Sequence, residues 1–262
     1  SGATGLPSSR YLDPEDPTVR TDFQVPVEGQ ESPWQRAAFV FAYDGNRVRS
    51  APRNLDRLLA YAKENPGRLT YPAPPDFTGS AFVRQVVAAK GEDAGFAYLK
   101  ELGPFLYRRG KTYPKSEAEL NRLFGDGQVD FAMSYDPAFV NSGVRKGQFP
   151  RTARPFSLGD GSLQNTSFVT IPANAAHPEG AKVIADLLLS PRLQAAKADP
   201  ASIGNPTVLD LDRLGARRRL FAETEGSRYL LSDYGRTLAE LPADRVEDLE
   251  KRWTLEVLRR SP

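Results

Sequence analysis

The chain has no cysteine and only one histidine among its 262 residues, and both absences exclude chemistry. Without cysteine there is no disulfide framework, no thiolate metal site and no cysteine nucleophile. The single histidine, His177, is too few for a histidine-based zinc centre and leaves a Ser-His-Asp triad nearly untenable. Because Pro178 follows it and proline suits the first turn of a helix, we predict that His177 is an exposed capping-region residue.

Long apolar runs and a dominant charge sign are also missing. No apolar stretch approaches the roughly 20 residues that span a bilayer, and residues 1–10 lack the apolar segment of a signal peptide and resemble a linker. The 35 basic and 33 acidic residues are interspersed and give a net charge of +2. We therefore expect no nucleic-acid partner and interpret the run 217–219 of three arginines as a solvated helix face.

Strand-like and helix-like segments alternate along most of the chain, after a stretch at 10–33 that holds at most an edge strand. Apolar patterns predict strands at 37–43, 68–71, 129–133 and 165–171. They predict helices at about 54–64, 80–89, 93–102, 116–124, 178–189, 191–198 and 243–258. This alternation favours an α/β fold with mainly parallel sheets.

The first candidate binding segment follows the predicted strand at 68–71. A stiff loop, Pro72–Pro75, leads into Asp76–Ser80, which opens the next predicted helix. Free N–H groups at a helix start attract anions and acceptor groups, and Gly79 would let a ligand approach the backbone closely. The alternative interpretation is that Thr78 simply caps its helix.

Two further candidates follow the same logic. Tyr135 and Asp136 come just after the buried strand at 129–133 and offer an aromatic ring, a hydroxyl and a charge, although Asp136 alone is also typical of a helix cap. The segment Gly159–Ser162 precedes the strand at 165–171, and we interpret it as a turn.

Motifs of catalysis are absent from the sequence. There is no phosphate-binding loop, dinucleotide fingerprint, nucleophile elbow or EF-hand loop. Asp76 and Asp136 have the residue types of a glycosidase-like carboxylate pair, but nothing distinguishes them among 33 acidic residues. We therefore predict a binding protein rather than an enzyme, with no catalytic residues, no metal and no cofactor. An enzyme using this pair, or a ligand-sensing domain of a receptor or regulator, remains the alternative.

Several segments resemble the extracellular solute-binding proteins of ABC importers. The resemblance rests on the following segments: Asn54–Leu59, Asn65–Pro72, Asp76–Ser80, Gly127–Ser134, Gly180–Lys182 and Leu188–Gln194. It is strongest for the YnjB-like branch, whose relatives bind thiamine, polyamines and iron. The resemblance implies a type II periplasmic-binding fold of two α/β lobes.

The same resemblance divides the chain into three parts. Residues 1–43 would be a remnant of lobe one and a hinge strand, because the resemblance implies that this sequence starts after the strand-helix units with which lobe one normally begins. Residues 44–164 would form lobe two, which binds the ligand. Residues 165–262 would contain the hinge crossover and C-terminal helices that pack on lobe one.

The resemblance also implies a site, a mechanism and a location. The ligand would be lined by Asp76, Phe77, Thr78, Gly79, Ser80, Tyr135 and Asp136, with Trp34 and Tyr43 on the hinge or lobe-one side. A monomeric, periplasmic or extracellular protein would close around a small molecule and then dock on a membrane permease. Aromatic rings beside acids favour a thiamine-like or other organic cation.

Overall fold

The computed structural model describes residues 5–221 and 227–259, which form two compact units. Unit 1 combines residues 1–37 with 164–227, and unit 2 combines 38–163 with 228–262. Each unit is therefore assembled from two separate stretches of chain. The predicted division differs at the C-terminal end, because residues 228–262 belong with 38–163. The reason lies in α9 (Val246–Trp253), which packs on α3 (Phe77–Lys90) of unit 2.

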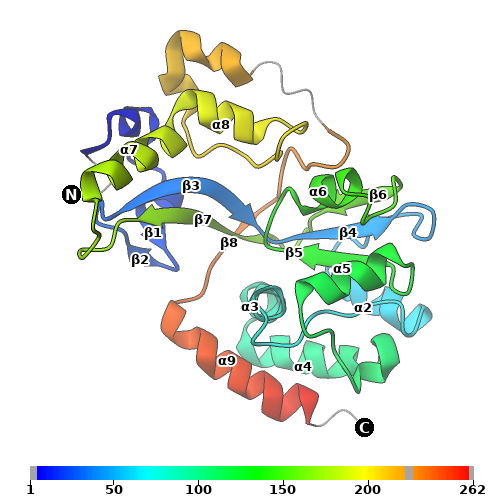
Figure 1. Ribbon diagram of the computed structural model, residues 1–262. Coiled ribbons are helices and arrows are strands. Elements are labelled where there is room, and N and C mark those ends of the chain that lie inside the picture. Colours follow the sequence, from blue (N-terminus) through cyan, green and yellow to red (C-terminus); the bar gives the residue numbers. More distant parts are fainter. Residues whose placement is uncertain (1–4, 222–226, 260–262) are drawn as a thin grey trace. The chain divides into compact units, whose positions relative to one another are not determined.

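Unit 2 contains a three-stranded sheet in the order β5-β4-β6 (Figure 1). Its strands are β4 (Val40–Asp44), β5 (Phe131–Ser134) and β6 (Ala153–Phe156). The central strand β4 is antiparallel to both neighbours, with Val40 opposite Ser134 and Phe41 opposite Phe156. The α/β composition is confirmed, but the prediction of parallel pairing is wrong for this sheet. The chain passes through four helices between β4 and β5, so no single-helix crossover joins these neighbours.

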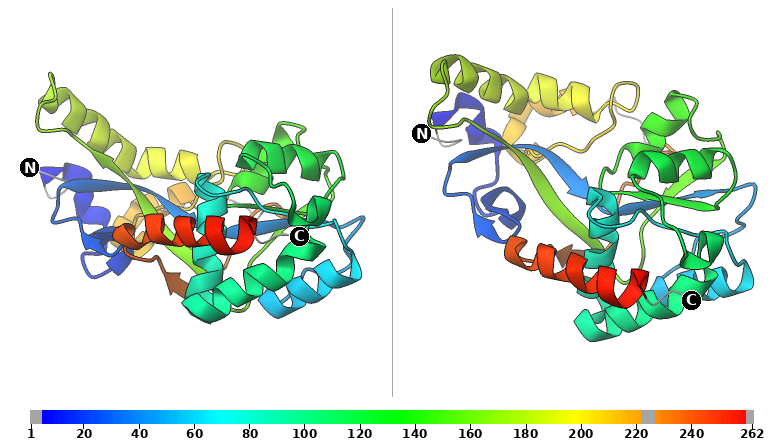
Figure 2. Two further views of the ribbon diagram at one scale, coloured as in Figure 1. Left: turned by 90° about the horizontal axis from the view of Figure 1, so that it is seen from below. Right: turned by 60° about the horizontal axis from the view of Figure 1, so that its bottom comes forward.

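The helices of unit 2 follow the apolar periodicity closely. They are α2 (Leu55–Glu64), α3 (Phe77–Lys90), α4 (Glu92–Leu102), α5 (Glu117–Gly125), α6 (Phe139–Arg145) and α9 (Val246–Trp253), with a π-helical turn at Thr254–Leu258. The side chain of Asn54 caps α2, and the hydroxyl of Ser116 accepts the N–H of Glu119 at 3.2 Å at the start of α5. The helices α3, α4 and α9 lie against one another (Figure 2).

Buried aromatic rings fill the space between the sheet and α3. Phe39, Phe41 and Phe82 are each at most 1% exposed, and their ring centroids lie 5.3–6.3 Å apart. Farther along, Trp253 of α9 is fully buried and its indole N–H donates to the Tyr71 hydroxyl at 2.9 Å. Residues 68–71 belong to this core but form no strand, because their backbone bonds to loops: Asp130 N donates to Arg68 O, and Tyr107 N to Leu69 O.

Unit 1 is built around two long strands and two consecutive helices. Its regular elements are α1 (Pro17–Arg20), β1 (Thr21–Asp22), β2 (Val25–Pro26), β3 (Glu31–Ala38), β7 (Ser162–Thr170), α7 (Pro178–Leu189), α8 (Pro191–Ala198) and the 3-10 helices Pro7–Tyr11 and Leu211–Phe221. The strands β3 and β7 are neighbours, and β8 (Thr237–Ala239) joins β7 at its unit 2 end. The predicted helices at 178–189 and 191–198 are confirmed.

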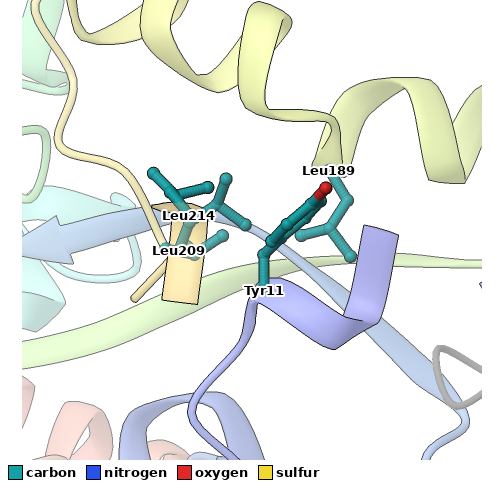
Figure 3. Close-up of a cluster of buried hydrophobic side chains, with 5 residues drawn as sticks. Tyr11, Leu189, Leu209 and Leu214 are labelled. Carbon is teal, nitrogen blue, oxygen red and sulfur yellow. The ribbon is translucent and has the colours of Figure 1, made fainter. Parts of the chain in front are cut away.

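A small hydrophobic cluster holds the outer segments of unit 1 together. Tyr11, Leu189, Val208, Leu209 and Leu214 are buried there, and Figure 3 shows the Tyr11 ring directed toward Leu189. His177 is the exposed N-cap residue of α7, and residues 217–219 are exposed in a helical segment, as predicted. Within the described residues, no helix has both the length and the apolar character that a bilayer crossing requires.

Candidate functional site

The loop before α3 is organised by the carboxylate of Asp76. This side chain caps α3, accepting the N–H groups of Thr78 at 3.0 Å and Gly79 at 3.1 Å. It also accepts the N–H of Glu117 at 3.3 Å, which ties α3 to α5. The capping residue is therefore Asp76 and not Thr78. Since a carboxylate already occupies the N–H groups at this helix start, an anionic ligand would meet a negative charge there.

Gly79 serves the packing of this loop. A Cβ at position 79 would lie 2.1 Å from the carbonyl oxygen of Pro72 and 2.7 Å from its carbonyl carbon. The space that glycine leaves open, which the sequence suggested for a ligand, is filled by the backbone of Pro72. Ser80, one residue on, is buried and accepts a hydrogen bond from Arg84 at 2.8 Å.

Glu117 lies at the centre of the acidic side chains and was not predicted. Its carboxylate accepts the hydroxyl proton of Thr78 and also bonds the hydroxyl of Ser134. Burial raises the pKa of Glu117, the charges of Asp136 and Asp76 raise it further, and the two hydroxyl groups oppose the shift. Three carboxyl groups from α3, α5 and the end of β5 therefore share one electrostatic environment.

Aromatic side chains stand beside this acidic group. The Phe77 ring is 60% exposed, and its centroid lies 5.7 Å from that of Tyr135. The hydroxyl of the buried Tyr135 donates to Glu240 at 2.7 Å. Burial, and then the charge of Asp136, raise the pKa of Tyr234. An exposed ring next to carboxylates can hold a cation through its π face as well as through charge.

A buried ion pair lies beneath the exposed ring. Arg84 of α3 donates to Glu240 at 2.5 Å, and the two side chains are 3% and 2% exposed. The same guanidinium carbon lies 5.9 Å from the centroid of the Phe77 ring. Glu240 thus links Arg84 and Tyr135, the two side chains that contact Phe77. Sequence reasoning missed both Arg84 and Glu240, because they lie 156 residues apart and neither belongs to a motif.

The structure gathers most of the predicted site residues and separates two. Asp76–Ser80, Tyr135 and Asp136 all lie in unit 2, where Asp76, Thr78 and Asp136 are near Glu117 and Phe77 lies beside Tyr135. Tyr43 is also in unit 2, but it lies three residues along β4 from Val40, the partner of Ser134, which is about 10 Å. Its ring packs on Phe156 at 5.7 Å. Trp34 lies in β3 of unit 1.

The two carboxylates considered as a catalytic pair have local structural roles. Asp76 caps α3, and Asp136 accepts the N–H of Ala138 at 2.9 Å in the turn before α6. The turn at 159–162 is likewise structural, because Asp160 accepts the N–H of Leu55 at 2.6 Å and Gly161 has φ 113°. In the part of the chain that the structure describes, no group of three His, Cys, Asp or Glu side chains could hold a metal ion.

Trp34 takes part in the buried environment of a lysine. The ammonium group of Lys197 donates to the carbonyl oxygens of Trp34 and Pro206, both at 2.9 Å, and lies 4.9 Å from the centroid of the Trp34 ring. Lys197 is 2% exposed. Burial, and secondarily the positive charge of Arg36, lower its pKa to about 7. These contacts of Trp34 with Lys197 lie within unit 1.

This lysine is expected to make stability depend on pH. Its folded pKa is about 7 and its ordinary value is 10.5, so between these pH values the unfolded chain binds more protons than the folded one. Stability therefore rises with pH in that window. From pH 7 to pH 9 we expect the wild type to gain about 2 kcal/mol of unfolding free energy relative to Lys197→Met, measured by urea denaturation. A parallel pH trend in the two proteins would contradict this, and Lys146→Met, at an exposed lysine, serves as the control.

Comparison with known proteins identifies the class. Residues 7–212 match the family described as bacterial extracellular solute-binding protein. The chain is 40% identical over 269 residues to protein YnjB of Escherichia coli strain K12, covering 96% of this chain and 68% of the relative.

Solved structures agree on the fold. The chain is similar to a periplasmic thiamin-binding protein, with a TM-score of 0.69, 18% identity and coverage of 100% of this chain and 72% of that one. It is also similar to a putative spermidine/putrescine ABC transporter protein from Listeria monocytogenes, with a TM-score of 0.66, 14% identity and coverage of 98% and 76%. The fold is that of the type II periplasmic binding proteins, a two-lobed α/β fold.

The chain belongs to the bacterial extracellular solute-binding protein family, the substrate-capturing proteins of ABC transporters. The members of this family are transport proteins rather than enzymes.

Proposed function

We propose that this chain captures a small organic cation of the thiamine or polyamine class and delivers it to the membrane permease of an ABC importer. The supporting observation is the shared environment of Asp76, Glu117 and Asp136 next to the exposed ring of Phe77. A positive ligand would relieve the repulsion among the carboxylates and gain a cation–π contact.

The sign of the charge separates this ligand class from anions. The helix start at α3, which could otherwise bind an anion, is occupied by the Asp76 carboxylate. The cationic side chain beside Phe77, Arg84, is 2% exposed and paired with Glu240. An anion beside Asp76, Glu117 and Asp136 would therefore be repelled by three acidic groups, whereas a cation would be attracted by them.

The similar proteins named above support the same class. Two of them carry names that refer to thiamin and to spermidine and putrescine, which are organic cations. In the proposed cycle a monomer in the periplasm or outside the cell binds its ligand in lobe two, here unit 2, closes lobe one over it about the hinge, and docks on the permease without chemical turnover. Phe77 and Tyr135 would contact the ligand directly.

A thermal-shift panel tests the ligand class. Thiamine, spermidine and putrescine are compared with sulfate, phosphonates and neutral sugars. A ligand at about 100 times its Kd should stabilise the folded protein by about 2.7 kcal/mol. We expect a cationic hit that Tyr135→Ala weakens and that Asp76→Asn abolishes, because asparagine keeps the cap but removes the charge. A hit confined to anions or sugars would contradict the proposal.

Glu117 is expected to make binding depend on pH. Because its pKa is raised, Glu117 stays protonated to a higher pH than an ordinary glutamate, and a protonated carboxyl does not attract a cation. Affinity should therefore rise with pH through this pKa, with proton release on binding. We expect Glu117→Gln to weaken binding at pH 8 by roughly tenfold and to flatten the pH dependence, measured by titration calorimetry in two buffers. An unchanged pH profile in Glu117→Gln would show that another group titrates.

A further inference from the structure

A cavity in unit 2 differs in charge from the group of Asp76, Glu117 and Asp136, which we call the acidic wall. It has a volume of about 420 Å³ and lies between the segment 107–115 and helix α5. Its lining includes the cationic side chains of Arg108, Lys115 and Arg122, with the Thr112 hydroxyl and the Tyr107 ring beside them. We call it the basic pocket.

The positive charges around the basic pocket are largely uncompensated. Arg108, Arg109, Lys111 and Lys115 are exposed, and none pairs with a carboxylate within residues 5–221 and 227–259. Arg122 forms an exposed pair with Asp126 at 3.4 Å, a kind of contact that contributes little. The lining contains one carboxylate, Glu119, which accepts the N–H of Lys115 at 2.8 Å. A group with two negative charges would therefore meet a net positive site.

The backbone on the rim of the pocket is held in an uncommon conformation. Arg108 and Arg109 have φ values of 53° and 59°, and Gly110 follows at 67°. A Cβ at position 110 would lie 2.6 Å from the carbonyl oxygen of Gly103, so packing requires glycine there and fixes the turn. This region is sterically unfavourable for non-glycine residues, and residues held in it cluster at binding sites.

Further contacts fix the side of the pocket that carries Arg108. Tyr107 N donates to Leu69 O at 2.8 Å, and the Tyr107 hydroxyl donates to Gln128 at 2.9 Å. The Arg108 guanidinium carbon lies 5.3 Å from the centroid of the Tyr107 ring. Arginine placed on a ring keeps its planar fork available for a second partner. The cation at the rim is thus oriented before any ligand arrives.

We propose that the basic pocket binds a phosphate-bearing group. A guanidinium matches two phosphate oxygens at once, and lysine adds a point charge. Arg108, Lys115 and Arg122 would supply the charge, and Thr112 a hydroxyl donor. A free phosphate compound and the headgroup of an anionic lipid both carry such a group and present the same chemistry. This site is independent of the acidic wall and of the ligand proposed for it.

The test compares variants on the full chain with defined probes. Inorganic phosphate and pyrophosphate are titrated by calorimetry, and vesicles of phosphatidylcholine with and without phosphatidylglycerol are used in co-sedimentation. Arg108→Gln/Lys115→Gln is expected to weaken binding at least tenfold. Glu119→Gln is expected to strengthen it severalfold, because it removes the only negative charge from the lining of the pocket. Arg192→Ala, at an exposed arginine of α8, is the control.

The outcomes separate the two sources. The expected order of affinity is Glu119→Gln, then the wild type, then Arg108→Gln/Lys115→Gln. Saturable pyrophosphate binding in this order supports a free phosphate ligand. Binding to vesicles alone in the same order supports a lipid headgroup. Binding that is equal in the wild type and the double variant overturns the proposal, as does the absence of binding to every probe. Arg108, Lys115 and Arg192 are exposed and Glu119 is half-buried, and a cooperative melt at the wild-type temperature confirms that the variants remain folded.

Discussion

Gly79→Ala is expected to lower the free energy of unfolding by about 3 kcal/mol and to abolish ligand binding. The new Cβ would lie 2.1 Å from the carbonyl oxygen of Pro72 and 3.1 Å from the carbonyl carbon of Ala73. Both neighbours are backbone atoms, so relief requires movement of the loop or of the start of α3. Such a shift would displace Asp76 and Phe77 from their present positions. Urea denaturation and the thermal-shift panel measure the two effects.

Gly180→Ala is the matched control for this substitution. Gly180 lies in the first turn of α7, and a Cβ there meets no atom within 4 Å. Alanine in an unobstructed helical position stabilises a protein by about 0.4–1 kcal/mol. Opposite signs are therefore expected for the same chemical change. A Gly79→Ala protein as stable as the wild type would show that the Pro72 loop yields easily and that its close approach is not required.

Glu240→Gln is expected to lower the free energy of unfolding by about 3 kcal/mol or more. Glutamine keeps the size and the acceptor oxygen, but it removes the negative charge that lies 2.5 Å from the buried guanidinium of Arg84. Removing one partner of a buried ion pair costs about 3–5 kcal/mol. The Tyr135 hydroxyl also loses a charged acceptor, so weaker binding of the ligand at the Phe77–Tyr135 rings is expected as well.

Two companion variants distinguish charge from packing at this pair. Glu101→Gln removes a partner of Lys63 from an exposed pair whose side chains are 53% and 43% exposed, and we expect a change of less than about 0.5 kcal/mol. Arg84→Met/Glu240→Met removes both charges, and it should recover most of the stability lost in Glu240→Gln. If the double variant is no more stable than Glu240→Gln, the loss comes from the hydrogen bonds and not from an uncompensated charge.

The helices and their caps could be predicted from the sequence because their causes are local. Asn54 and Ser116 satisfy N–H groups three residues ahead, and Pro178 and Pro191 begin α7 and α8 at the predicted positions. The segment Asp76–Ser80 was recognised for similar reasons. A polar residue before an apolar helix accepts N–H groups from the next few residues, so a short stretch of sequence is enough to predict where the helix begins.

The remaining features depend on partners far away in the chain. Glu117 was not recognised because its neighbours Asp136 and Ser134 come from the end of β5, and a helix-start glutamate usually contacts only its own turn. Arg84 lies in an apolar helix, and its ion pair with Glu240 comes from a segment 156 residues away. The antiparallel pairing of β4 and the packing of α9 on α3 also depend on which distant segments become neighbours in the fold. Apolar periodicity does not encode this.

The division of each unit into two stretches of chain has a consequence for biosynthesis. Unit 1 needs residues 164–227 to join 1–37, and unit 2 needs 228–262 to join 38–163. The ribosome synthesises these stretches in order. Residues 1–37 therefore leave it more than a hundred residues before 164–227, the stretch with which they pack. Contacts of such long sequence separation slow folding. Completion is therefore expected only when the segment carrying Trp253 is synthesised, and a chain that stops at residue 227 should expose the apolar face of α3 to chaperones and proteases.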